Sequence, residues 1–303
     1  MFAPSPSYAD DLNLCKVKAP DWQPVSVGFP VKIERLNSLT NPKVLVIPFK
    51  LKDTPDYAFT AQMKQNYEKA ADSISQLSNG KSRPQFVFSK TIETVILQSE
   101  IQMIRENAAA ENQAKSETYS AYGFVRRVIA KHDPEINFKG YSGVILEGSM
   151  PDKAIAEAHT FLRNWDPFFR PISTGEGEIL NTILMDSHWN PSVIAHEVMH
   201  LYGLADLYGT STGPGYLSMM ATNDYTLLSY EKWLLGWLPE SNVRCSSNAP
   251  TNSISRISFD SSKDSELIFL RSTDTSTYFL ETSKAFGVKH LAFYSLQIEK
   301  RQP

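Results

Sequence analysis

Residues 196–200 read His-Glu-Val-Met-His, which is an H-E-x-x-H motif. Histidines four residues apart lie on one face of a helix, so the imidazoles of His196 and His200 can reach a single ion. Neutral imidazole nitrogens suit Zn²⁺, and a catalytic zinc site keeps one position for water beside three protein ligands. Zinc lowers the pKa of that water, and Glu197, beside the first histidine, can accept its proton without binding the metal. The motif therefore predicts metal-assisted hydrolysis with Glu197 as the general base.

The third metal ligand has two candidates. Gly203 can adopt a positive φ, end the helix and turn the chain back, which lets Asp206 approach the ion. The rival is Glu231 on a later helix, as in zinc peptidases whose third ligand is a distant glutamate. We favour Asp206 because Gly203 has no purpose in the rival arrangement.

The helix that must carry the motif has its own start and stop signals. Asn190 is an N-cap residue, and Pro191 follows at the first helical position. The helix is predicted to run to Leu201 or Tyr202, immediately before Gly203.

Strand and helix patterns alternate ahead of this helix. Buried-strand patterns occur at 43–49, 141–146 and 179–184, and one or two further strands are expected within 86–97. Helical patterns occur at 63–77, at 101–131 as one helix or two, and at 152–163. After residue 246, short strand patterns at 254–259, 266–270, 278–281 and 290–298 are separated by Ser/Thr/Asp turns.

This order predicts an α/β (α+β) protein in three parts. Residues 1–42, rich in proline, form an extended lead-in. Residues 43–245 form the catalytic domain, with an upper half to about residue 203 and a lower half at 204–245. A mixed, twisted sheet with an edge strand near 179–184 belongs to the upper half, and residues 246–303 form a small β-rich unit.

Composition narrows the class of protein. The chain has 303 residues, 42% of them hydrophobic, and 30 basic residues against 33 acidic ones give a formal net charge of −3. That balance provides no field for nucleic acid, and no apolar run approaches the roughly 20 residues of a membrane span. Composition therefore predicts a globular protein and makes no prediction of its oligomeric state. The expectation of a protein or peptide substrate rests on the H-E-x-x-H motif and not on composition.

Two cysteines, Cys15 and Cys245, allow one disulfide or two free thiols, and their positions in the sequence do not decide between them. Cys15 in the lead-in could also occupy the open zinc position as a latency switch, but a structural or bridged cysteine is favoured. Residues 1–30 contain no apolar core of a signal peptide.

Three segments carry a family resemblance: 196–208 (HEVMHLYGLADLY), 215–219 (GYLSM) and 228–238 (LSYEKWLLGWL). Together they resemble the immune inhibitor A family of secreted bacterial metallopeptidases. Weaker similarity extends over 44–53, 138–144 and 278–281.

The resemblance implies a metzincin-like zincin with one zinc ion on His196, His200 and Asp206, and with Glu197 as the base. It implies that the methionine of the turn beneath the metal is Met219, with Met220 as the alternative. It also implies secretion, which a single disulfide would suit.

Two further sets of residues remain open. One tyrosine could donate a hydrogen bond to the reaction's oxyanion, and the candidates are Tyr216, Tyr225 and Tyr230. An acidic stretch could bind Ca²⁺ through Asp166, Glu176 and Glu178, but its spacing matches no calcium loop, so a solvated loop is preferred.

The predicted function is therefore a zinc-dependent endopeptidase. The alternatives are a secreted zinc-containing binding module or pseudoenzyme, and a hydrolase of non-protein amides. A structural zinc site is closed by four protein ligands, whereas a catalytic site keeps exchangeable water, so the coordination separates an enzyme from a binding module.

Overall fold

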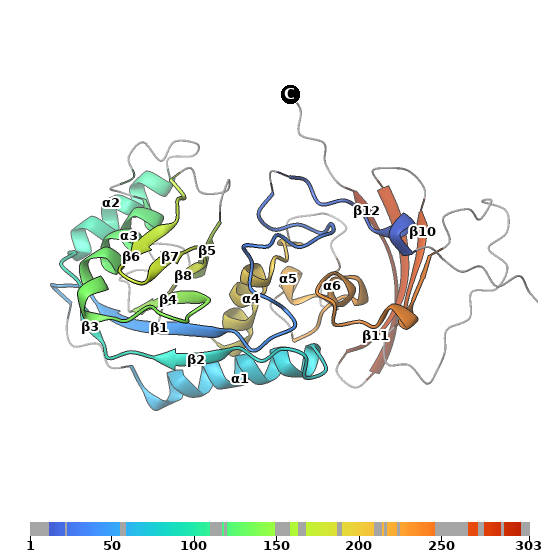
Figure 1. Ribbon diagram of the computed structural model, residues 1–303, viewed down its shortest axis with the longest axis horizontal. Helices are drawn as coiled ribbons and strands as arrows, with labels where there is room; N and C mark the ends of the chain where they lie inside the picture. The colour runs from blue at the N-terminus through green and yellow to red at the C-terminus, as the bar shows by residue number, and fades with distance from the viewer. Residues whose placement is uncertain are drawn as a thin grey trace, which may run out of the picture.

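The computed structural model describes residues 12–21, 23–54, 59–109, 117, 120–148, 158–162, 168–186, 190–208, 214, 217–222, 225–245, 266–271, 276–285 and 288–297. A large sheet with its helices lies at one end of the molecule and a smaller sheet at the other, with α4, α5 and α6 between them (Figure 1). The chain is a mixed α/β protein.

The large sheet is mixed, with strand order β2-β1-β4-β8-β5 and a short β3 that also pairs with β1. Its strands are β1 (Lys43–Lys50), β2 (Gln85–Phe88), β3 (Ile92–Glu93), β4 (Gly143–Gly148), β5 (Ala158–Phe161) and β8 (Thr182–Asp186). All pairs are parallel except β5 with β8, which is antiparallel.

Two expectations about this edge of the sheet were wrong. The strand expected near 179–184 as the edge is β8, which lies inside the sheet, and β5 forms the edge instead. The described part of the helix expected at 152–163 is this strand β5. Thr160 faces the helix α4, and Phe161 packs in the cluster on the opposite face. Pairing with β8 and this two-residue alternation outweigh the helical pattern.

Helices cover both faces of the large sheet. Helices α1 (Ala61–Leu77) and α4 (Pro191–Tyr202) pack on one face, with α1 starting at the N-cap Thr60. Helices α2 (Gln98–Ala109) and α3 (Ala121–His132) cover the other, so the helical region expected at 101–131 is two helices (Figure 1).

The remaining elements of this part are short. A hairpin of β6 (Ile172–Thr174) and β7 (Gly177–Ile179) lies near α3, whose end continues into the 3-10 turn η3 (Asp133–Glu135). No helix among the described residues is both long and apolar enough to cross a bilayer.

The second sheet has the order β12-β11-β10-β9. Its strands are β9 (Val243–Cys245), β10 (Glu266–Arg271), β11 (Ser276–Ala285) and β12 (Val288–Gln297). The sheet takes its first strand from residues before 246, within the range assigned to the catalytic domain. The strand expected at 254–259 lies outside the described residues.

Cys15 and Cys245 form a disulfide that joins the lead-in to β9. The alternative of two free thiols is therefore wrong, and a sulfur held in this bond is not available as a zinc-binding latency switch. Cys15 lies in the 3-10 turn η1 (Leu12–Cys15), and an apolar cluster beside it joins α6 (Ser229–Leu234) to β9 and β10. The lead-in also contacts the end of α4, where the Ser26 amide donates to the Gly203 carbonyl.

Candidate metal centre

Helix α4 begins and ends where its local sequence predicts. The Asn190 side chain accepts hydrogen bonds from the amides of Ser192 and Val193, at 3.0 and 3.2 Å, and Pro191 is the first helical residue. Gly203 ends the helix with a φ of 107°. A Cβ at Gly203 would lie 2.6 Å from Val31 Cγ1, so both backbone conformation and space require glycine.

The turn at Gly203 brings Asp206 back to the two histidines of α4. Asp206 Oδ1 lies 3.2 Å from His196 Nε2 and 3.2 Å from His200 Nε2. The three potential ligand atoms lie within 4.8 Å of one another, and both histidines are buried. This buried group could bind a metal ion.

A hydrogen bond at the Nδ1 side of each histidine ring fixes the orientation of the imidazole. His196 Nδ1 lies 2.8 Å from the Met219 carbonyl, and His200 Nδ1 lies 2.8 Å from the Leu204 carbonyl. A carbonyl oxygen only accepts, so each Nδ1 carries the hydrogen, and a neutral ring then presents a lone pair at Nε2. Asp206 Oδ1 is buried and receives no hydrogen bond. With both rings neutral, two imidazole nitrogens and one carboxylate oxygen converge as acceptors, and this set of ligand atoms fits a cation such as Zn²⁺.

Electrostatics favour positive charge at this point. Burial raises the pKa of Asp206, but the two histidines outweigh burial and lower it, so Asp206 is an anion. Burial lowers the pKa of His200, but Asp206, Glu197 and the Leu204 carbonyl together outweigh burial and raise it.

The predicted base, Glu197, is buried beside the group and is not a member of it. Its Oε2 accepts a hydrogen bond of 2.6 Å from Thr160 Oγ1 on the edge strand β5. Thr160 could not be recognised from the sequence, because the pattern at 152–163 predicts a helix. An alternating Thr-Phe pair is the only local sign of a strand, and 37 positions separate Thr160 from Glu197.

Tyr208 is a second residue that the sequence analysis did not single out, although it closes the motif block. Its ring stacks on His196 with centroids 6.2 Å apart, and the side chain lies beside Asp206. Burial and the charge of Asp206 raise the pKa of Tyr208 to about 12, so the phenol keeps its proton at neutral pH.

The three tyrosines considered as oxyanion donors have different positions. The Tyr230 hydroxyl donates to the Val27 carbonyl, and burial raises its pKa, so its proton is committed to a buried contact. The Tyr225 side chain is exposed and lies beside Ser192. Tyr216 lies outside the described residues.

The rival ligand Glu231 is not brought to the histidines. Its carboxylate accepts hydrogen bonds from Ser218 Oγ and from the Leu228 amide, both at 2.8 Å to Oε2. Burial raises the pKa of Glu231 to about 8. Asp206 therefore takes the place beside the histidines, while Glu231 supports the turn that contains Ser218.

Both methionines of the doublet are buried against α4. They form the start of α5 (Met219–Thr222), and Met219 supplies the carbonyl that faces His196. Met219 as the methionine beneath the metal, with Met220 as the alternative, stays a prediction.

The calcium hypothesis gains no support from the part of the chain that the structure describes. Among those residues no second group of three potential metal ligands occurs. Glu176 accepts a hydrogen bond from the Phe138 amide, Glu178 is exposed on β7, and Asp166 lies outside the described residues.

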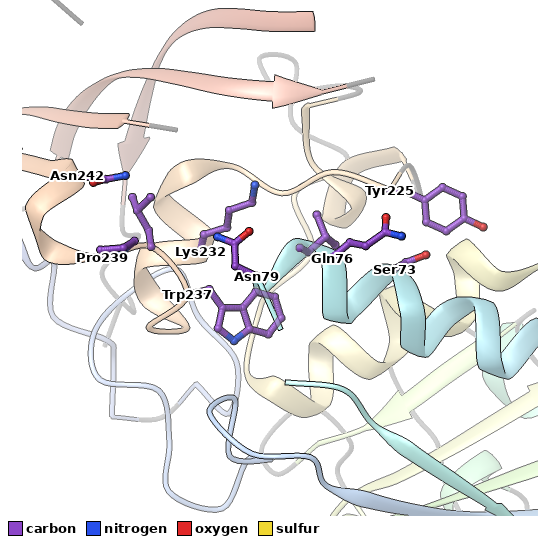
Figure 2. Close-up of a pocket in the computed structure, with 10 residues that line it drawn as sticks. Ser73, Gln76, Asn79, Tyr225, Lys232, Trp237, Pro239 and Asn242 are labelled. Carbon is purple, nitrogen blue, oxygen red and sulfur yellow. The ribbon is translucent and has the colours of Figure 1, made fainter. Parts of the chain in front are cut away.

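A hollow of about 410 Å³ lies between the end of α1 and the segment that follows α6. Figure 2 shows Asn79, Tyr225, Lys232 and Trp237 around it. None of the residues of the His196 group lines this hollow, so the metal centre is identified by its donor atoms and not by this hollow.

Comparison with known proteins gives no family for the chain, because no family model matches it and no curated protein matches it.

Proposed function

We propose that this protein is a zinc-dependent endopeptidase of the metzincin-like type, with His196, His200 and Asp206 as the zinc ligands and Glu197 as the general base. The observation that carries the proposal is that the Nε2 atoms of two buried histidines both lie 3.2 Å from one buried carboxylate oxygen of Asp206, with the Glu197 carboxylate beside them. The family resemblance of 196–208 supports the same assignment.

The number of ligands supports a catalytic site over a structural one. Two imidazoles and one carboxylate make three protein ligands, and among the described residues no fourth His, Cys, Asp or Glu joins the group. Structural zinc sites are closed by four protein ligands, whereas hydrolytic sites keep a position for water.

The residues of the site then have separate tasks. Zinc, when bound, supplies a Lewis acid that activates water and polarises a carbonyl group. The Glu197 carboxylate accepts the proton of the attacking water and delivers it to the leaving amine. Because Thr160 donates to Oε2, the proton is expected on Oε1. Burial of Glu197 and of both histidines keeps bulk water away from this transfer.

Secretion forms part of this proposal, on the strength of the resemblance. The disulfide between Cys15 and Cys245 is compatible with an oxidising compartment.

The test compares casein hydrolysis by the wild type and by Glu197→Ala, each with and without a zinc chelator, together with the zinc content of each protein. The wild type should carry one zinc ion per chain and cleave casein, and the chelator should abolish cleavage. Glu197→Ala should keep its zinc and lose cleavage, while Glu178→Ala, which changes an exposed glutamate of β7, should behave as wild type.

Three results would contradict the proposal in different ways. Cleavage by Glu197→Ala would remove Glu197 as the base. Zinc binding without cleavage of casein or of a peptide library would favour the binding-module hypothesis. Cleavage of small amides alone would favour the amide-hydrolase hypothesis.

A further inference from the structure

We propose that three buried residues outside the metal centre, Ser218, Glu231 and Glu281, are positioning residues for the metal ligands, so that the C-terminal sheet forms part of the metal site. This inference rests on the proposed function, because it assigns a task toward the zinc ligands named there. The chain of contacts runs from β11 through α6 to α5, and from α5 to His196 and to the loop of Asp206.

The first step is the contact between α5 and the ligands. The Met219 carbonyl lies 2.8 Å from His196 Nδ1 and so fixes which nitrogen faces the ion. The next carbonyl, that of Met220, accepts a hydrogen bond of 2.8 Å from the amide of Leu207, the residue after Asp206. Two consecutive peptide groups therefore orient two of the three candidate ligands.

The second step is the side chain that fixes these peptide groups. Ser218 is fully buried, and its hydroxyl oxygen accepts a hydrogen bond of 3.1 Å from the Met220 amide. The same hydroxyl donates to the Glu231 carboxylate, 2.8 Å from Oε2 and 3.0 Å from Oε1. Glu231 thus sets the direction of a hydroxyl whose oxygen holds the turn.

The third step connects Glu231 to the C-terminal sheet. Glu231 lies in α6, and the first turn of α6 is held by Glu281 of β11, whose carboxylate accepts from the amides of Ser229 and Tyr230 at 3.0 and 3.4 Å. The Ser229 hydroxyl also donates to the Thr282 carbonyl at 3.0 Å. Helix α6 contacts β10 and β11, and Figure 1 shows it between α5 and this sheet.

The energetic cost of this arrangement indicates a specific task. Glu231 and Glu281 are both buried, and burial together with the charge of Glu281 raises the pKa of Glu231 to about 8. An apolar pair would pack at this place without that penalty. The hydrogen bonds of Ser218, Glu231 and Glu281 supply what apolar side chains cannot, which is a directed contact with the turn that holds the ligands.

The test measures zinc affinity of the metal-free protein by competition with a chromogenic chelator, so that its main readout is independent of catalysis. Ser218→Ala is compared with Ser78→Ala, which removes an equally buried serine hydroxyl that bonds the backbone of Ser82 at the end of α1. Glu231→Leu is compared with Glu231→Gln, which keeps an acceptor oxygen for Ser218 and Leu228. Glu281→Ala tests the link to the sheet.

Substitutions of residues that orient metal ligands reduce metal affinity by about 10–100-fold, and this range is expected for Ser218→Ala and Glu231→Leu. Ser78→Ala should bind zinc as the wild type does, and Glu231→Gln should restore most of the affinity lost in Glu231→Leu. Glu281→Ala should weaken zinc binding in the same direction. In casein hydrolysis at saturating zinc, Ser218→Ala should lower kcat and leave KM unchanged.

Wild-type zinc affinity in Ser218→Ala and Glu231→Leu would overturn the inference. Equal losses in Ser78→Ala and Ser218→Ala would also overturn it, because they would show a general effect of destabilisation. A wild type that binds zinc but cleaves no peptide would refute the proposed function while the affinity comparison still decides the positioning role. A wild type that takes up no zinc would refute both.

Discussion

Glu231→Gln should stabilise the metal-free protein, and the gain should grow with pH. Burial raises the pKa of Glu231 in the folded state from the ordinary value of 4.5 to about 8. A carboxyl group with a raised pKa binds its proton more tightly when folded, so the free energy of unfolding falls as pH rises between these two values. The neutral amide of glutamine does not titrate, so in Glu231→Gln this residue causes no fall in the free energy of unfolding as pH rises.

The magnitude follows from the two pKa values. One pH unit corresponds to about 1.36 kcal/mol, so the full window from 4.5 to about 8 corresponds to about 5 kcal/mol, and about 3 kcal/mol is reached by pH 7. These values are large against a typical domain stability of about 5–15 kcal/mol. The difference in free energy of unfolding between Glu231→Gln and the wild type should therefore be small near pH 4.5 and reach its plateau above pH 8.

The assay is urea unfolding of both proteins at pH 5, 6, 7 and 8 with a chelator present, since bound zinc would add its own stabilisation. Glu281→Gln is the companion variant, because it removes the neighbouring charge that contributes to the raised pKa. When Glu231→Gln is made in the Glu281→Gln variant, its effect on the free energy of unfolding should depend less on pH, but the dependence should persist. Burial is the larger cause of the raised pKa of Glu231. Parallel pH profiles for wild type and Glu231→Gln would refute the reasoning, because they would mean that Glu231 keeps an ordinary pKa.

Four further results are expected. Asp206→Ala should weaken zinc binding in chelator competition beyond the roughly 10–100-fold expected for positioning residues, because it removes a ligand. Thr160→Val should lower kcat for casein roughly tenfold with KM unchanged, whereas Thr160→Ser should keep activity, since only the hydroxyl bonds Glu197. Gly203→Ala should lower the free energy of unfolding by about 1–3 kcal/mol in urea, because Gly203 has a φ of 107° that alanine adopts only with strain. Replacing Cys15 and Cys245 by alanine should cost about 2–5 kcal/mol in the same assay, because the bridge closes 230 residues.

The parts of the site that could be predicted from the sequence are those determined by nearby residues. Helix α4 was predicted because Asn190, Pro191 and Gly203 act on the backbone within a few positions of themselves. Asp206 was favoured as the partner of the histidines for the same reason, since one turn at Gly203 brings it back. Metal binding by this group stays a prediction.

The parts that could not be predicted depend on contacts between distant segments. The position of β5 at the edge of the sheet is decided by pairing with β8, and it outweighs a helical pattern. The disulfide joins residues 230 positions apart, and their spacing gave no preference between a bridge and free thiols. The hydrogen bond between Thr160 and Glu197 depends on both the strand and the helix being in place.

Glu231 shows why residue type alone is insufficient near such a centre. A glutamate about 30 positions after an H-E-x-x-H motif has the right chemistry for a zinc ligand, so Glu231 is a rival candidate from the sequence alone. In the structure its carboxylate is used by Ser218 and Leu228, so its acceptor atoms face the turn beneath the ligands. The candidate ligands lie within eleven consecutive residues, but the groups that orient them come from segments that reach Glu281. Changes at α6 or β11 should therefore affect the metal site before they unfold the protein, and this separates a positioning role from a purely structural one.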